Sequence, residues 1–136
     1  MKFEDKYFTA FTFTKEQVDR NLSNAFRDLN IAQKDQIREV KFNYVYTAFL
    51  KAGIALLSWH QVRVKSQPGH HLKIIEKMAE VLEDESIADI GNAMRVKRNA
   101  DLYVGGVEIT EKECREYIDF VEKILSRVKK IVTCGK

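Results

Sequence analysis

The stretch that decides the fold is residues 35–64, DQIREVKFNYVYTAFLKAGIALLSWHQVRV. Its apolar side chains recur at helical spacing, and they are Ile37, Val40, Tyr44, Val45, Ala48, Phe49, Ala52, Ala55, Leu56 and Trp59. A helix over this range is on the order of 45 Å long, which suits the central member of a bundle. Gly53 within it indicates that another backbone approaches closely. We therefore predict a long helix that has Asp35 as its N-cap and ends near Val64.

Two capping-box sequences predict a helix on each side of this one. In a capping box the first residue bonds the amide three positions later, and the side chain there bonds back. Thr14–Gln17 has this form and begins a helix that ends near Asn30. Thr110–Glu113 repeats the form and begins a last helix, whose apolar stripe reaches Ile131.

Two shorter helices are predicted between the long helix and the last one. Pro68 suits the first turn of a helix that carries apolar side chains as far as Leu82. Ser86 then begins another helix, and Gly105–Gly106 ends it. Short loops between amphipathic helices are typical of an antiparallel bundle. The sequence therefore predicts an all-α, antiparallel up-and-down bundle of about five helices.

Composition is consistent with a single domain over residues 1–136, with an aromatic arm over 1–13 and a frayed tail over 133–136. The chain is 45% hydrophobic, and its one Pro and six Gly are too few for an all-β protein. The net charge of +3 does not by itself imply nucleic acid. Cys114 and Cys134 have no disulfide-framework or metal-ligand spacing, and no signal peptide or membrane span is recognisable. We expect a cytoplasmic protein without a metal or other cofactor.

The candidate site lies in residues 87–106, IADIGNAMRVKRNADLYVGG. Ile87 and Met94 mark a buried stripe, and Arg98 lies only about 20° from Ile87 on the helical wheel. A charged side chain on a buried stripe is costly unless it is paired or used. Two interpretations stay open: Arg98 forms a structural ion pair with Asp101, or it belongs to a functional site with Asn99 and Tyr103.

At this point the chain resembles the HEPN superfamily of small helical-bundle proteins. The resemblance rests on Arg98–Asn99 followed by Tyr103, and on Pro68–Gly69–His70–His71 opening the preceding helix. It spans residues 14–132. Active members of the family carry Arg-Asn-x-x-x-His, and two such motifs meet across a dimer to cleave RNA without a metal. The resemblance implies that Arg98 holds the scissile phosphate, beside Asn99, with position 103 as the catalytic one.

Tyr103 departs from the family pattern in a way that affects the chemistry. A metal-independent ribonuclease needs a group that titrates near neutral pH, and Tyr, whose usual pKa is about 10, is a poor base at pH 7. The resemblance therefore implies RNA or nucleotide binding with weak or absent cleavage. Arg95, Lys97, Asp101 and His71 are the candidate substrate-binding residues. For the adjacent His70 and His71, either both are surface residues of a first helical turn, or one folds over the Arg98 site and replaces the missing base.

The resemblance also implies partners. Such domains occur in toxin–antitoxin or defence systems, as homodimers that are paired with a nucleotidyltransferase. The alternative from another class is a non-catalytic helical module that binds a protein. The tyrosine at position 103 favours the second function over cleavage.

Overall fold

The computed structural model describes residues 2–100 and 108–134 of the chain. Five helices and one two-stranded sheet form this described part. In chain order the elements are β1 (Phe8–Ala10), α1 (Lys15–Lys34), α2 (Arg38–Trp59), β2 (Val62–Val64), α3 (His70–Val81), α4 (Glu85–Ala100) and α5 (Glu111–Cys134). The predicted all-α bundle is confirmed. Among the described helices none is long and apolar enough to cross a bilayer.

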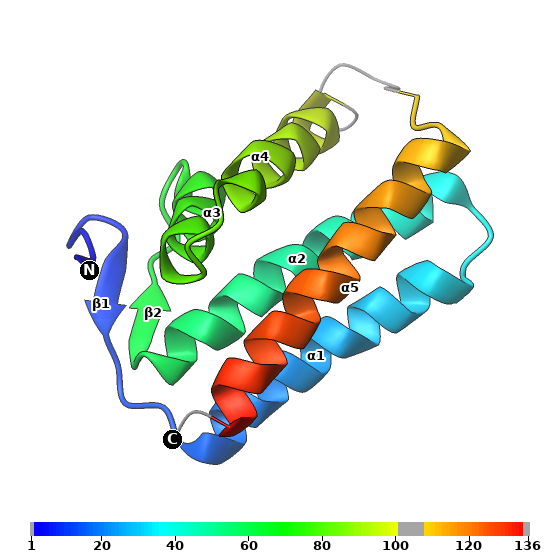
Figure 1. Ribbon diagram of the computed structural model, residues 1–136. Coiled ribbons are helices and arrows are strands. Elements are labelled where there is room, and N and C mark those ends of the chain that lie inside the picture. The colour runs from blue at the N-terminus through cyan, green and yellow to red at the C-terminus, as the bar shows by residue number, and fades with distance from the viewer. Residues whose placement is uncertain (1, 101–107, 135–136) are drawn as a thin grey trace.

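Helix α2 is the centre of the molecule. It contacts each of the other four helices, and Figure 1 shows α1 and α5 beside it, with α3 and α4 grouped next to it. Because neighbours surround it, α2 buries side chains on several faces, including Phe42, Tyr46 and Phe49. The central position predicted for this helix is confirmed.

Two glycines set how closely α3 approaches its neighbours. A Cβ atom at Gly53 would lie 2.5 Å from Cγ2 of Ile74. A Cβ atom at Gly91 would lie 2.7 Å from the ring of Phe49 and 2.8 Å from Cγ2 of Ile75. These distances are too short for any real Cβ, so both positions require glycine for this packing. The neighbours of Gly53 are the side chains of Ile74 and Met78, and not another backbone as predicted.

The predicted end of the long helix is wrong. Helix α2 ends at Trp59, and Gln61 follows with a φ of 61°, which interrupts the helix before Val64. Residues 62–64 instead pair antiparallel with residues 8–10, with Phe8 opposite Val64. The β-branched valines suit a strand, and the N-terminal arm supplies its partner. The expected aromatic arm is therefore partly a strand.

The predicted capping interactions are present at the helix ends, but some helices begin or end a few residues from the predicted positions. Both predicted capping boxes are present, at Thr14 and at Thr110. Helix α1 extends past the predicted Asn30 to Lys34. Asp35 bonds the amide of Ile37 without being the N-cap itself, since that position is Ile37.

The starts of α3 and α4 also shift slightly from the prediction. Pro68 precedes α3, and Gly69, with a φ of 84°, is its N-cap. The cap of α4 comes from Asp84, whose Oδ1 accepts bonds from the amide and hydroxyl of Ser86. The predicted end of this helix at Gly105–Gly106 lies outside the described residues.

Candidate functional site

The inner face of α4 carries Arg98, as the stripe from Ile87 predicted. Ile87 and Met94 are fully buried, and Arg98 continues their face one turn later as a partly buried side chain. Its guanidinium carbon lies 5.7 Å from the ring centre of Tyr46 on α2. Its Nε is buried and has no hydrogen-bond partner among the described residues. A buried donor without a partner is unfavourable, so this atom suits an acceptor from beyond the described residues, either the predicted Asp101 or a ligand.

Two histidines at the start of α3 lie next to this arginine. The rings of His70 and His71 are 4.5 Å apart. Nδ1 of His70 is 2.7 Å from the carbonyl oxygen of Gln67, and Nδ1 of His71 is 3.2 Å from the hydroxyl of Tyr46. The fold therefore brings His71 to the Arg98 side of α3, and a role of either histidine as the missing base stays a prediction.

These two hydrogen bonds give the histidines opposite roles. A carbonyl oxygen only accepts, so Nδ1 of His70 carries the proton and Nε2 of the neutral ring is an acceptor. Of the two neutral tautomers of His71, we assign the one whose Nδ1 accepts from the Tyr46 hydroxyl, because a buried phenol donor needs an acceptor. His71 then carries its proton on Nε2 and is a donor. The site thus combines one proton acceptor and one neutral donor.

The surroundings hold Tyr46 and His71 in their uncharged forms. Burial raises the pKa of Tyr46 to about 12, although Arg95 and Arg98 oppose this shift. Burial also lowers the pKa of His71, and electrostatic interactions with His70, Arg98 and Arg95 lower it further. At neutral pH the phenol therefore keeps its proton and the imidazole stays neutral.

An open pocket of about 430 Å³ lies in front of these groups. It is lined by residues 66–69 of the loop after β2, by residues 70–72 of α3, and by Arg95 and Asn99 of α4. We call it the α3–α4 pocket. The first-turn amides of α3 have no partner within the helix, and the positive end of its dipole lies there.

Arg95 gives the pocket a positive charge that has no acidic partner among residues 2–100 and 108–134. Its Nε and Nη2 donate to the amide oxygen of Asn92, at 3.0 and 2.8 Å, and it makes no ion pair within the described part of the chain. A guanidinium beside helix-start amides and a neutral imidazole donor suits an anion, and phosphate above all.

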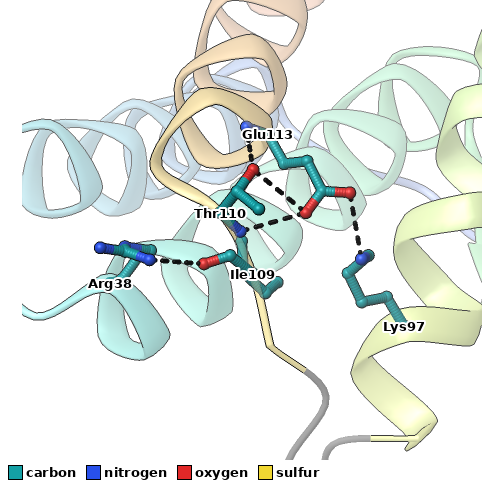
Figure 2. Close-up of polar contacts among 5 residues, drawn as sticks. All are labelled: Arg38, Lys97, Ile109, Thr110 and Glu113. Carbon is teal, nitrogen blue, oxygen red and sulfur yellow. Dashed lines mark hydrogen bonds and ion pairs between the residues drawn. The ribbon is translucent and has the colours of Figure 1, made fainter.

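Lys97 lies apart from the pocket, although the sequence grouped it with Arg95. Its Nζ is 3.2 Å from Oε2 of Glu113 on α5, and Figure 2 shows this pair beside the capping box at Thr110. Glu113 accepts the Thr110 amide at 3.1 Å, and that bond and Lys97 lower the pKa of its carboxyl. Lys97 thus joins α4 to the start of α5. It is a structural residue in this arrangement.

The structure brings together four of the seven predicted site residues. Arg95, Asn99 and His71 line the α3–α4 pocket, and Arg98 lies behind it beside Tyr46. Asp101 and Tyr103 lie outside the described residues, so the Arg98–Asp101 pair and the role of Tyr103 stay predictions. Within the described residues, no group of His, Cys, Asp and Glu side chains is arranged to hold a metal ion.

Sequence reasoning missed Tyr46 as a member of the site. Phe42, Tyr46, Phe49 and Gly53 recur at i, i+4, i+7 and i+11, which is a helical stripe of its own. This stripe faces α3, α4 and Phe120 of α5. The periodicity of α2 therefore contains a signal for a buried tyrosine, although the stripe alone does not indicate that the histidines lie opposite it.

A second pocket, of about 560 Å³, lies between the α1–α2 turn and the start of α5. Lys41, Glu111 and Cys114 are among its lining residues, so its charges are mixed. The Cys114 side chain is buried, as its place on an apolar stripe predicted, and burial raises the pKa of its thiol. These features favour a packing role for this cysteine.

No family model matches this chain, and neither a curated protein nor a solved structure is detectably similar to it. The geometry of its own residues therefore carries the functional argument.

Proposed function

We propose that this chain is a HEPN-like domain that binds a phosphate group of RNA or of a nucleotide in the α3–α4 pocket. The observation that carries the proposal is the grouping of Arg95 and Arg98 with a neutral His71 at the start of α3. Arg95 supplies charge at the pocket wall, and Nε2 of His71 donates a hydrogen bond. Asn99, also in the wall, adds a side-chain amide that contacts sugar or base.

Cleavage, in this proposal, is slow or absent. RNA cleavage without a metal needs a base to take the 2′-hydroxyl proton. The family places a histidine where this chain has Tyr103, and the tautomer of His71 makes it a donor. His70 is the proton acceptor in the pocket wall. Tyr103→Phe and Tyr103→His, each incubated with single-stranded RNA in chelator, test this part through the yield of 2′,3′-cyclic phosphate ends.

The binding itself is tested with a fluorescent single-stranded RNA and three variants of α4. Arg95→Gln and Arg98→Gln each remove a guanidinium from the site. Lys97→Gln is the matched control, since it removes a positive charge from the same helix but outside the pocket. Hydrogen bonds to charged groups contribute about 1.5–3 kcal/mol, so each arginine variant should lose about tenfold or more in affinity.

The same titrations also report the salt dependence. Each lost phosphate contact should reduce the slope of log affinity against log salt by about 0.7 for single strands. Lys97→Gln should keep both the slope and most of the affinity. If Lys97→Gln weakens binding as much as Arg95→Gln does, the binding is general surface attraction and the pocket has no special role. If Arg98→Gln lowers the melting temperature but leaves the affinity for RNA unchanged, the role of Arg98 is structural.

Assembly and setting complete the proposal. The resemblance supports a homodimer in which two Arg98 side chains face one cleft, a nucleotidyltransferase as partner, and a cytoplasmic location. Sedimentation at micromolar concentration tests the first of these. A monomer there removes the shared-cleft arrangement and leaves phosphate binding by one chain.

The second candidate function is a protein-interaction module. Ile37 and Val96 support it, since their side chains are 59% and 52% exposed. Large apolar side chains with this exposure are typical of a contact surface when they gather into a patch. Absence of RNA and nucleotide binding in the titrations above favours this function.

A further inference from the structure

A second group of side chains lies beyond the pocket, where residues 11–13 run beside β2. The rings of Phe11 and Phe13 have their centres 4.7 Å apart, and the guanidinium carbon of Arg63 lies 4.9 Å from the centre of the Phe11 ring. Phe11 is 38% exposed. We call Phe11, Phe13 and Arg63 the aromatic platform. Phe13 packs against the core, so the platform is anchored on one side and open at Phe11.

The backbone that carries the platform is held firmly by Gln61. The carbonyl oxygen of Gln61 accepts the Phe11 amide at 3.1 Å, and its side-chain Oε1 accepts the Phe13 amide at 2.7 Å. Nε2 of the same side chain donates to the carbonyl oxygen of Phe13 at 3.2 Å. Gln61 has a φ of 61°, which is unusual for a residue with a side chain. This strained residue therefore holds the aromatic pair in place before any ligand arrives, which reduces the entropy lost on binding.

Arg63 has a charge that is available to a ligand. Its side chain is exposed, and it makes no ion pair with any carboxylate in the described ranges. A guanidinium plane stacked over an aromatic ring is a surface on which a nucleic-acid base stacks well.

The platform and the α3–α4 pocket are joined by a short length of chain. β2 ends at Val64, and Ser66 already belongs to the pocket wall. Only Val64 and Lys65 lie between Arg63 and Ser66, and an extended chain spans roughly 10 Å at most over these three steps. A ligand with a phosphate in the pocket thus has the platform within reach of its next bases.

We infer that the aromatic platform binds a base of single-stranded RNA whose phosphate occupies the α3–α4 pocket. The inference rests on the proposed function and names its substrate more closely. A strand must be single for a base to turn out and stack, whereas a duplex keeps its bases inside. A mononucleotide whose phosphate and base both lie in the pocket has no further base for the platform. The chain therefore prefers single-stranded RNA of several nucleotides over both duplex RNA and mononucleotides.

The test compares two probes on the native chain and two variants. The probes are a fluorescent ten-nucleotide oligouridylate, followed by anisotropy, and uridine monophosphate, used as its competitor. Stacking on one aromatic side chain corresponds to about 5- to 150-fold in affinity. Phe11→Ala should therefore weaken oligouridylate binding at least fivefold and leave the inhibition constant of uridine monophosphate unchanged. Val96→Ala is the control, because it shortens an exposed apolar side chain on α4, and it should change neither affinity.

The outcomes separate this inference from the proposed function. If Arg95→Gln weakens both probes and Phe11→Ala weakens neither, the pocket binds phosphate and the platform is not a base-binding site. If Phe11→Ala reduces the affinity for both probes equally, the platform does not distinguish the oligonucleotide from the mononucleotide, and the inference is also wrong. If the native chain binds neither probe, the proposed function fails together with the inference. A melting curve of Phe11→Ala like that of the native chain establishes that the loss is local.

Discussion

The hydroxyl oxygen of Tyr46 lies 3.2 Å from Nδ1 of His71, and this contact joins the middle of α2 to the first turn of α3. Tyr46 is 2% exposed, so its hydroxyl depends on that partner. With the hydroxyl as donor, Nε2 of His71 carries the proton, and this tautomer decides whether the imidazole donates to a ligand or accepts from it.

Tyr46→Phe tests this contact directly. A phenol that donates to Nδ1 stabilises the neutral imidazole, so its removal should raise the pKa of His71 towards the usual value of about 6.5. The free energy of unfolding should fall by about 0.5–1.5 kcal/mol with the lost hydrogen bond. Chemical shifts of the His71 ring across pH 4–8 measure the pKa. Tyr44→Phe, on an exposed tyrosine of the same helix, should alter neither quantity.

Stability should fall as the pH drops below about 6.5, because two histidines favour the neutral form in the folded chain. Burial lowers the pKa of both His60 and His71. Between the usual pKa and the lowered one, the unfolded chain binds more protons than the folded chain, so acid favours unfolding. Carboxylates with lowered pKa values, such as Asp84, stabilise the folded chain while they are ionised, so their contribution to stability is lost only at more acidic pH.

Urea denaturation at pH 7.5 and pH 5.5 measures this dependence. His71→Gln and His60→Gln should each reduce the difference in the free energy of unfolding between the two pH values, and the double variant should nearly abolish it. A native chain that is equally stable at both values contradicts the expected shifts.

Gly91→Ala should destabilise the chain, although alanine usually favours a helix over glycine. The added Cβ would meet the Phe49 ring and Ile75, and overpacking of a core costs about 1–3 kcal/mol. Ala93→Gly on the exposed side of α4 is the control, and it should lose only about 0.5–1 kcal/mol through helix propensity. Thermal or urea unfolding distinguishes the two. Stabilisation by Gly91→Ala would mean that α4 packs against α2 and α3 more loosely than these distances require.

The two capping boxes should respond differently to acid. Thr14→Ala and Thr110→Ala should each lower stability by about 1 kcal/mol at neutral pH. The Thr14 box pairs with the neutral Gln17, whereas the Thr110 box pairs with Glu113, whose pKa is lowered mainly by the Thr110 amide. A carboxyl with a lowered pKa stabilises above its usual pKa of about 4.5, and the contribution disappears as the pH falls through its folded value.

The measurement is urea unfolding of Thr14→Ala and Glu113→Gln at pH 7 and pH 3, because Thr110→Ala keeps the backbone amide that binds the Glu113 carboxylate. The difference in stability between the native chain and Glu113→Gln should shrink at pH 3, while that for Thr14→Ala should persist. A difference for Glu113→Gln that is equal at the two pH values would mean that the Glu113 charge adds nothing to stability.

The helices could be predicted because their signals are local. Periodicity placed α2, and the paired Thr14–Gln17 and Thr110–Glu113 sequences placed the starts of α1 and α5. The end of α2 could not be predicted, since it depends on a remote partner. Val62–Val64 leaves the helix because residues 8–10 pair with it, and helical spacing in residues 35–64 carries no information about that arm.

The candidate site was predictable only in part, for a related reason. The α4 stripe placed Arg98 on the inner face, the motif resemblance pointed to Asn99, and Arg95 was a candidate as a member of a short basic group. Which side chains lie opposite them depends on how α2, α3 and α4 pack. Tyr46 belongs to the site because its hydroxyl contacts His71. Lys97 lies outside the site because it forms an ion pair with Glu113 on another helix.

The pairing of β1 with β2 also has a consequence for the order of folding. The chain between these strands forms the whole of α1 and α2, so their pairing closes a long loop, which is costly in entropy until the two helices pack against each other. We expect the strand pair to form late and to open first, as a local unit of low stability. Amide hydrogens of residues 8–10 should then exchange with deuterium long before those in the middle of α2, and Phe11 should move away from Arg63 during each opening.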